Sequence, residues 1–531
     1  MTNALIIFVI LVVTFVPYIG FLTDKIYSID RFFHFDYFVM SAGWAHLNGQ
    51  TIFVDVNSNY SVGMTVLLSR LACLFGEFDY ASMVTVIMLL GLLYWCIGFL
   101  FLRSWLKNTF IAALGIFLTI NLEMFHGGVS PVVWRFPSAT VIRHIFDLGV
   151  FFALLQHSRT ERKQYLWLAS GFCALAIAYM LDTGVYLTVS FFAYLAVQMM
   201  FKPLRGALLG SLRDIVPLLL KMALPFAGAG VILLIIQGPS LFTHAYWQNA
   251  TEYSRLFLNG FGDLPLTYAL EQKQYIAFAF GLLIPVFYTG SLLLSTTLIG
   301  QGYFKREHCL LVFLSCYGML LYHYYIFRSG PTSYDAVIVP AVFLLSFWVK
   351  QGWDIVKPMG RIILGFCLTA SVVAMFAFNP WFRQYPNVFY NIKVQKVQHF
   401  DFDLKPDVML IQSLTSKEQA VPLISSFETK VLMAAARKPF FYYFPFIYSV
   451  PFDTMDFHGT EMLTVERLKR TIQQLQEEQP AYVFVERKLF ERKLHPLYYQ
   501  KYTALTILLS YLNEFYTPYQ NGRFLCALKL K

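Results

Sequence analysis

Residues 81–102 read ASMVTVIMLLGLLYWCIGFLFL, a run of 22 residues without one charged side chain. A helix of this length would extend about 33 Å, slightly more than the hydrocarbon core of a bilayer, which is about 30 Å thick. Because hydrocarbon offers no partner to an exposed backbone N–H or C=O group, a single segment that crosses it must be helical. This run therefore predicts a membrane-spanning helix.

Similar apolar runs recur along the first 380 residues, and they predict about eleven spanning helices. We place these helices at residues 4–22, 81–102, 109–125, 140–156, 165–180, 184–200, 215–237, 276–298, 309–327, 336–349 and 362–379. The composition agrees, because 57% of the 531 residues are hydrophobic and 14% are charged, against roughly 45–50% and 25% in soluble globular proteins. The fold class that follows is a polytopic α-helical membrane protein. The first run has no basic segment before it, so we expect an uncleaved helix and not a signal peptide.

The polar connectors between these runs form two sets that differ in charge. Those at residues 103–108, 157–165, 201–214, 300–308 and 350–361 hold 13 Lys and Arg in 50 residues. Those at residues 23–79, 123–143, 181–183, 238–275 and 328–335 hold 8 in 127 residues. Since Lys and Arg concentrate in cytoplasmic loops, we expect a cytoplasmic N-terminus and an extracytoplasmic C-terminal region, in a bacterial inner membrane. The same bias explains the net charge of +10, so we expect no nucleic-acid partner.

The first outer loop, residues 23–79, has two segments of its own. Residues 36–48 (DYFVMSAGWAHLN) predict a short amphipathic helix that ends at Asn48 and Gly49. Residues 61–76 (SVGMTVLLSRLACLFG) are apolar but contain Arg70. Counting this segment as a span would reverse every later loop and break the charge rule, so we expect an interfacial helix.

Beyond residue 380 the composition changes, and residues 381–531 contain 19 Lys and Arg and 14 Asp and Glu. The pattern predicts strands at 408–411, 481–485 and 523–530, and helices at 464–478 and 497–516. Such alternation indicates a small α/β domain on the extracytoplasmic side, joined to a transmembrane domain at residues 1–380. No Gly-rich phosphate loop or nucleophile elbow occurs in this region, so we expect a structural or acceptor-positioning role.

Ionisable residues gather in the predicted outer loops, all on one side of the membrane. They are Asp30, Arg31, His34, Asp36, Asp55, Arg135, Arg143, His144, Asp147, Asp182, His323, Arg328 and Asp335. Charged groups at membrane depth cost roughly 2.5–3.5 kcal/mol each on insertion scales, so they tend to face a cavity or a partner. A carboxylate beside Arg and His suits transfer from a phosphate leaving group, since the carboxylate can accept a proton while the cations neutralise the phosphate.

Each of these residues also has a purely structural interpretation. Asp30 and Arg31 would form a solvated pair, Asp36 would cap the helix that follows it, and Asp55 would cap a turn with Asn57 and Asn59. Arg143 and His144 would pair with Asp147 or with lipid headgroups, and Asp182 would cap the helix after it. The sequence leaves these alternatives open.

The order of features in the first outer loop resembles the GT-C superfamily of integral-membrane glycosyltransferases. The loop reads HFDYFVMSAGWAHLNG at residues 34–49, then Phe53-Val54-Asp55, then Tyr60-Ser61-Val62-Gly63, and ends Leu74-Phe75-Gly76. Asp182-Thr183-Gly184 is similar to the acidic turn with Gly that many members have between paired helices. The chain departs from the pattern in two ways, because Asp36 is followed by Tyr37 instead of a second acid and the prolines of the Tyr-x-Pro element are missing.

The resemblance implies an inverting transferase that takes a sugar from a polyprenyl-phosphate-linked donor, with Asp36 as the general base that activates the acceptor hydroxyl. The acceptor would be a lipid, a glycan or a protein. The residues that the resemblance suggests for substrate binding are His34, Asp55, Tyr60, Arg135, Arg143, His144, Asp182 and Arg328, with one of the arginines on the lipid phosphate. The C-terminal domain would cover the outer opening and help to admit the acceptor.

Two other functions and two local features stay open at this stage. A transporter or flippase would carry internally repeated halves and a polar site at the bilayer midplane, and we find no such repeat. A polymerase or ligase of lipid-linked glycans would also use outer-loop arginines. No Cys or His spacing predicts a metal site, and a divalent cation would need more than Asp36, with Asp55 or Asp182 as candidates. Asn249-Ala250-Thr251 is a glycosylation sequon, a tripeptide that is common by chance.

Overall fold

The computed structural model describes residues 2–23, 39–58, 60–124, 140–200, 212–252, 275–300, 307–326, 335–378, 404–425, 427–444, 460–491 and 503–531. The chain divides into two compact units. A helical unit comprises Met1–Asp24, Val84–Ile235 and Leu264–Val397, and a mixed unit comprises Lys25–Met83, Ile236–Asp263 and Gln398–Lys531. The first outer loop thus groups with the C-terminal region, while the predicted domain boundary at residue 380 stays a prediction.

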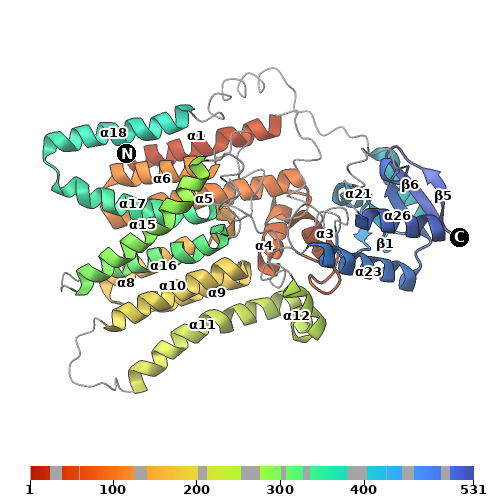
Figure 1. The fold of residues 1–531 in the computed structure, drawn as a ribbon, viewed down its shortest axis with the longest axis horizontal. Helices are drawn as coiled ribbons and strands as arrows, with labels where there is room; N and C mark the ends of the chain where they lie inside the picture. The colour runs from red at the N-terminus through yellow and green to blue at the C-terminus, as the bar shows by residue number, and fades with distance from the viewer. Residues whose placement is uncertain are drawn as a thin grey trace. The chain divides into compact units, whose positions relative to one another are not determined.

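A helix coincides with each predicted span (Figure 1). The helices are α1 (Thr2–Thr23), α5 (Tyr80–Leu106), α6 (Thr109–Met124), α8 (Asp147–Thr160), α9 (Gln164–Tyr179), α10 (Leu181–Met200), α11 (Leu212–Gln237), α15 (Tyr275–Gly300), α16 (Glu307–Ile326), α17 (Asp335–Ile355) and α18 (Pro358–Phe378). Within the described residues, four stretches are long and apolar enough to cross a bilayer, at Tyr80–Leu106, Pro217–Phe242, Gly281–Ile299 and Pro358–Met375. The protein is a multi-pass membrane protein, and the count of eleven spans stays a prediction.

The predicted span at 140–156 is the one that begins differently. A 3-10 turn, η4 (Val141–His144), precedes α8, which starts at Asp147. Thr140 is extended, and its side-chain oxygen accepts a hydrogen bond from the Ile142 N–H at 3.4 Å, so the chain enters a tight turn before it becomes an α-helix. This turn places Arg143 and His144 just before the first residue of α8, and the side of the membrane on which they lie stays a prediction.

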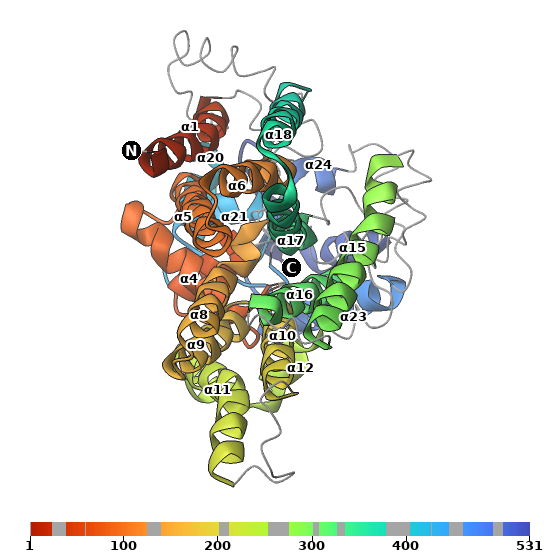
Figure 2. The same ribbon diagram turned by 90° about the vertical axis from the view of Figure 1, so that its left-hand side faces the viewer.

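Helix α16 lies among α8, α10, α15 and α17, and Figure 2 shows these neighbours around it. The interior that they share is aromatic. Phe101 of α5 stacks on Phe343 of α17, with ring centroids 5.6 Å apart, and it also contacts Phe151 of α8 at 5.7 Å. Aromatic pairs at these separations contribute beyond the area that they bury. This packing explains the density of Phe in the apolar runs.

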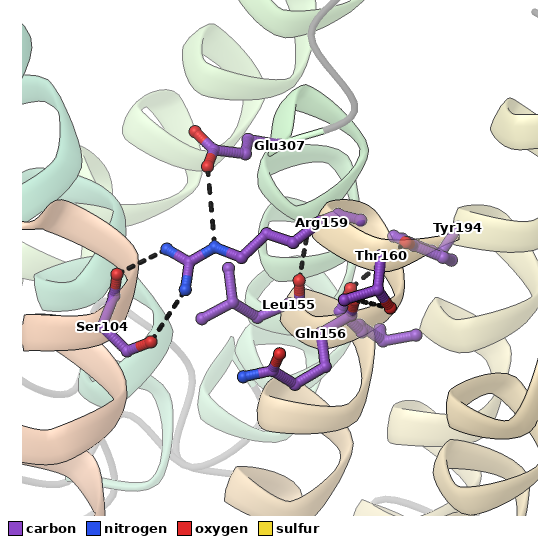
Figure 3. A network of polar contacts seen from close by, with 9 residues as sticks. Ser104, Leu155, Gln156, Arg159, Thr160, Tyr194 and Glu307 are labelled. Carbon is purple, nitrogen blue, oxygen red and sulfur yellow. Dashed lines mark hydrogen bonds and ion pairs between the residues drawn. The ribbon is translucent and has the colours of Figure 1, made fainter. Parts of the chain in front are cut away.

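Arg159, near the end of α8, joins three helices at one end of the bundle (Figure 3). Its Nη1 donates to the Ser104 hydroxyl of α5 at 2.9 Å, its Nη2 donates to the Ser104 carbonyl, and its Nε lies 4.0 Å from Oε1 of Glu307 in α16. All three residues belong to connectors that the charge pattern assigns to the cytoplasm. Their contacts agree with the predicted alternation of the helices, whereas the side that this end faces stays a prediction.

The mixed unit combines short helices with a small sheet. Its helical elements are α3 (Ser41–Leu47), α4 (Val62–Ala72), η2 (Cys73–Phe75), η5 (Gly238–Phe242), α12 (His244–Ala250), α20 (Lys405–Leu414), α21 (Glu428–Ala435), α23 (Thr460–Glu478), α24 (Arg487–Phe490) and α26 (Thr503–Phe515). Its strands are β1 (Ala420–Val421), β2 (Leu423–Ile424), β3 (Lys438–Pro439), β4 (Tyr482–Glu486), β5 (Tyr516–Asn521) and β6 (Leu525–Leu530).

The sheet has the order β2-β4-β6-β5, with β2 parallel to β4 and antiparallel pairing elsewhere, while β1 and β3 pair separately. Strands β4 and β6 lie where they were predicted. Helix α3 ends at Leu47 with Asn48 as its C-cap and Gly49 at a φ of 85°, as the predicted Asn-Gly cap requires. The strand predicted at 408–411 is wrong, because those residues belong to α20. Pro406 fits the first turn of a helix, and the buried Asp407, Leu410 and Ile411 follow helical spacing.

Other boundaries in the C-terminal region also differ from the prediction. Helix α23 begins at Thr460 and not at Thr464, and α26 ends at Phe515, where β5 starts. The hairpin of β5 and β6 is held by Asp407, whose Oδ1 accepts hydrogen bonds from the Phe524 and Leu525 N–H groups, each at 2.9 Å. The predicted start of the last helix, at 497, lies outside the described residues.

Candidate functional site

An ion pair between Arg143 and Asp182 stands at the end of the helical unit where α8 and α10 begin, which the charge pattern predicts to be the outer end. Arg143 belongs to η4, and Asp182 is the second residue of α10. The arginine side chain is 6% exposed and the aspartate side chain 33%. The Thr183 hydroxyl donates to the Arg143 carbonyl at 3.3 Å, and Asp182 Oδ1 accepts from the Thr183 N–H at 2.6 Å. Asp182 therefore lies within the first turn of α10 and does not precede the helix as a cap would, and it is the partner of a cation 39 residues earlier.

Gly184 allows this arrangement because α9 and α10 approach each other at backbone distance. A Cβ at Gly184 would lie 2.3 Å from the Ile177 nitrogen and 2.4 Å from the Ala176 carbonyl carbon. No side chain fits there, so the Gly of the Asp-Thr-Gly turn brings the start of α10 against α9. The motif therefore works as one unit, in which the glycine fixes the position from which Asp182 reaches Arg143.

A small pocket lies beside the pair and has room for about one water molecule. It is lined by Arg143, His144, Phe146, Asp147, Ala176, Tyr179, Thr183, Leu187 and Tyr317. His144 is buried, and among the described residues neither of its ring nitrogens has a hydrogen-bond partner. The Tyr317 hydroxyl likewise has none within the described part of the chain. Buried polar groups are ordinarily hydrogen-bonded, so these two point to a bound water or ligand.

Two further carboxylates are buried at the same end of the bundle. Asp147 Oδ2 accepts from the Tyr94 hydroxyl at 3.2 Å, and Glu123 Oε2 accepts from the Val141 N–H at 3.2 Å. The second oxygen of each carboxylate has no hydrogen-bond partner among the residues that the structure describes.

The predicted alternative of an Arg143–Asp147 pair is not what the structure shows, because Arg143 pairs with Asp182 and Asp147 with Tyr94.

Glu123, Tyr94 and Tyr317 belong to the site but are not marked by any sequence motif. Glu123 could have been noticed, since it is an acidic residue that closes the apolar run before the second outer loop. Nothing in the sequence distinguishes Tyr94 and Tyr317 from the other tyrosines of the apolar helices. They become part of the site only because α5 and α16 place them beside Asp147 and the pocket.

Asp55 and Tyr60 belong to the mixed unit, in the first outer loop. Asp55 Oδ2 accepts from the Thr51 N–H at 2.7 Å, so the carboxylate closes the turn that contains it. This is the turn-capping role weighed above, formed with Thr51 instead of Asn57. The Tyr60 carbonyl accepts from the Ser58 hydroxyl at 2.9 Å. A substrate contact by either residue stays a prediction.

Four of the predicted site residues, His34, Asp36, Arg135 and Arg328, lie outside the described residues. Within the described ranges, no three His, Cys, Asp or Glu side chains come together to hold a metal ion. Arg143, His144 and Asp182 are therefore the predicted residues that the structure brings together. A guanidinium at such a site can hold a phosphate through two parallel hydrogen bonds.

No family model and no curated protein sequence matches the chain. Among solved structures, ArnT from Cupriavidus metallidurans bound to undecaprenyl phosphate is similar over 99% of this chain and 97% of its own, with 13% identity and a TM-score of 0.50. The oligosaccharyltransferase of Archaeoglobus fulgidus, solved with zinc and sulfate, covers 97% of this chain and 72% of its own, with 12% identity and a TM-score of 0.47. Both are GT-C membrane glycosyltransferases. The similarity to ArnT shows that this chain has the fold of ArnT, and it confirms the resemblance seen in the first outer loop at the level of the fold.

Proposed function

We propose that this protein is a membrane glycosyltransferase that moves a sugar from a polyprenyl-phosphate-linked donor to an acceptor on the extracytoplasmic face. The observation that carries the proposal is the partly buried Arg143–Asp182 pair, in a chain with the fold of ArnT. The pair lies beside a pocket lined by His144, whose ring nitrogens have no hydrogen-bond partner among the described residues. ArnT was solved with undecaprenyl phosphate, which supports a donor of that class.

In the proposed reaction the acceptor hydroxyl oxygen attacks the anomeric carbon of the sugar, and inversion follows from attack opposite the leaving group. Asp36 takes the hydroxyl proton. The bond between the anomeric carbon and the phosphate oxygen breaks, and the polyprenyl phosphate leaves with the electron pair. Arg143 neutralises the negative charge that develops on this phosphate, with Arg135 and Arg328 as further candidates, since cations aimed at developing charge lower the barrier.

The neighbours of Arg143 have separate roles in this proposal. Asp182 keeps the guanidinium oriented when no donor is bound, and its partial exposure leaves it free to turn toward solvent when the phosphate arrives. His144, which lines the pocket, donates a hydrogen bond to the phosphate or to an ordered water. His34, Asp55 and Tyr60 would contact the sugar or the acceptor from the first outer loop.

The test is turnover by the purified full-length protein in detergent. Polyprenyl-phosphate sugars are supplied as a panel, sugar loss is followed by mass spectrometry, and wild type is compared with Asp36→Asn. The variant retains the size of the side chain and part of its capping ability but removes the base, so turnover should fall by about 10²-fold or more. Asp30→Asn, a carboxylate of the same loop outside the proposed site, is the matched control and should retain turnover.

Other outcomes lead to different conclusions. If turnover survives Asp36→Asn, the protein is still a glycosyltransferase but its general base is another residue. Asp55→Asn would then be measured in the same way. A chelator added to the wild-type reaction shows whether a divalent cation takes part. A folded protein that processes no donor in the panel, but transports solute into proteoliposomes, would overturn the proposal in favour of a transporter.

A further inference from the structure

The turn at residues 51–56 of the first outer loop is held in a conformation that its sequence does not favour. Phe53 has a φ of 67°, in the left-handed region that a bulky L-residue rarely adopts. Its N–H donates to the Val56 carbonyl at 2.7 Å, and the Asp55 N–H donates to the Thr51 carbonyl at 2.8 Å. A non-glycine residue stays in this left-handed conformation only where contacts from the surrounding structure hold it there.

Helix α12 contacts Phe53 at both its backbone and its ring. The Asn249 side-chain amide donates through Nδ2 to the Phe53 carbonyl at 2.7 Å. The Phe53 ring meets Tyr246 edge to face, with centroids 5.7 Å apart. A buried carbonyl that lost this donor would remain unsatisfied, which makes the hydrogen bond costly to remove. Asn249 therefore holds the left-handed residue in place.

The other side of the Asn249 amide faces the C-terminal region. Its Oδ1 accepts from Nη1 of Arg470, in α23, at 3.1 Å. The Arg470 guanidinium lies 3.7 Å over the ring of Tyr442, and the Tyr442 carbonyl accepts from the Asn57 N–H at 2.7 Å. The contacts thus return to the first outer loop just beyond the turn. Because a carbonyl can only accept and a guanidinium can only donate, these two partners fix which end of the amide is which.

A second contact ties the same segments together nearby. Glu252 follows α12, and its Oε1 accepts from the Tyr443 hydroxyl at 3.1 Å and lies 3.5 Å from Nε of Arg467, whose side chain is buried. This contact joins α12 to α23 without touching the turn. Of these two polar links between α12 and α23, the one through Asn249 continues to the first outer loop.

The burial of Asn249 also explains its sequon. Asn249 is 9% exposed, and its Nδ2, the atom that glycosylation would modify, is occupied by the Phe53 carbonyl. Thr251, the third residue of the sequon, donates its hydroxyl to the Trp247 and Gln248 carbonyls of its own helix. The asparagine is accounted for by the hydrogen bonds it makes, and the sequon is incidental.

We propose that Asn249 is a positioning residue, which fixes the left-handed turn of the first outer loop through Phe53 and connects that turn to α23 through Arg470. The inference rests on the proposed function for its catalytic consequence, because the first outer loop carries Asp36 and Asp55. In this arrangement a movement of α23 changes the loop that holds the base. The C-terminal region thereby reaches the left-handed turn through the Asn249 amide, in addition to the direct bond between the Tyr442 carbonyl and the Asn57 N–H.

Hydrogen exchange on the full-length protein in detergent tests the positioning without any need for activity. In Asn249→Ala, a peptide that covers residues 51–58 should exchange at least about tenfold faster than in wild type, because the Phe53 and Asn57 amides lose their support. Asn249→Asp should speed up exchange of the same peptide as Asn249→Ala does. Its carboxylate can still accept a hydrogen bond from Arg470 but cannot donate one to the Phe53 carbonyl. Thr251→Ala removes the sequon but leaves Asn249 intact, and should exchange as wild type does.

Arg470→Ala provides a second route if Asn249→Ala does not fold, and it should raise exchange of the same peptide to a smaller degree. Where wild type turns over donor, Asn249→Ala should lower kcat while the KM for donor stays within about twofold. Unchanged exchange of residues 51–58 in both Asn249→Ala and Arg470→Ala would overturn the proposal, as would faster exchange in Thr251→Ala. If the wild-type protein processes no donor but Asn249→Ala still exchanges faster at residues 51–58, the proposed function is wrong. The positioning role of Asn249 is then still supported.

Discussion

The guanidinium of Arg143 pairs with the carboxylate of Asp182 across 39 residues, from the turn before α8 to the start of α10. Neither residue is placed by its own helix alone. Thr140 begins the turn that presents Arg143, and Gly184 lets α10 approach α9 closely enough for Asp182 to reach it. The pair therefore links the position of a candidate phosphate-binding cation to the packing of two helices.

Replacing either residue of this pair should destabilise the protein. Replacing both should lower the free energy of unfolding by less than the sum of the two single losses. Arg143→Met and Asp182→Asn should each lower the free energy of unfolding by about 1–3 kcal/mol, below the roughly 3–5 kcal/mol of fully buried pairs because Asp182 is a third exposed. The double variant should recover about 1–2 kcal/mol of the summed loss. Unfolding of the purified proteins in detergent measures these values, and additive losses would contradict the pairing.

Turnover should respond differently from stability in the same variants. The double variant has no uncompensated charge, so its folding recovers, but it lacks the cation that would neutralise the donor phosphate. We expect donor turnover at least about tenfold below wild type in both Arg143→Met and the double variant. Recovery of turnover together with stability would show that Arg143 acts only in folding.

Gly184→Ala should be among the most damaging single-methyl changes in the helical unit. The added Cβ would lie 2.3 Å from a backbone nitrogen, which cannot move without shifting α9, so we expect a loss of about 2–4 kcal/mol. Gly171, in the same pair of helices, has no atom within 4 Å of an added Cβ. Gly171→Ala should therefore be neutral or stabilise by up to about 1 kcal/mol. Equal thermal unfolding temperatures for the two variants would contradict the close approach.

The sequence predicts the helices well because a bilayer imposes a length and a composition on each span. It could not predict which polar groups meet, since this depends on which helices are neighbours. The Asp-Thr-Gly turn and Arg143 were both recognised, but their pairing was not, and Glu123 and Tyr94 enter the site only through packing. In the C-terminal region, the four apolar residues 408–411 favour strand and helix equally, and the buried Asp407 could not be foreseen from its charge.

The mixed unit should lose stability as the pH falls below about 6.5. Burial, reinforced by the nearby Arg70, lowers the pKa of His46 below its ordinary value. The unfolded chain then binds a proton at His46 at a higher pH than the folded chain does, so the stability present above about pH 6.5 is lost as the pH falls toward the folded pKa. Unfolding temperatures at pH 7.5 and 5.5 measure the effect, and His46→Gln should reduce the difference between them. A difference that is the same in wild type and His46→Gln would assign the pH dependence to other groups.

Arg159 should contribute to stability through its geometry and not only through its charge. Its guanidinium donates to both the hydroxyl and the carbonyl of Ser104 while it faces Glu307, a fork that joins α5, α8 and α16. Arg159→Ala should lower the free energy of unfolding by about 1–2 kcal/mol, the lower part of the range for charged hydrogen bonds, because Arg159 and Glu307 are partly exposed. Arg159→Lys should recover less than half of this loss, since an ammonium cannot reproduce the planar fork. Arg162→Ala removes the same charge from an exposed position three residues away and should stay within about 0.5 kcal/mol of wild type. If Arg159→Lys were as stable as wild type, charge alone would hold this end of the bundle together, and the helices would be joined there without the specific contact to Ser104.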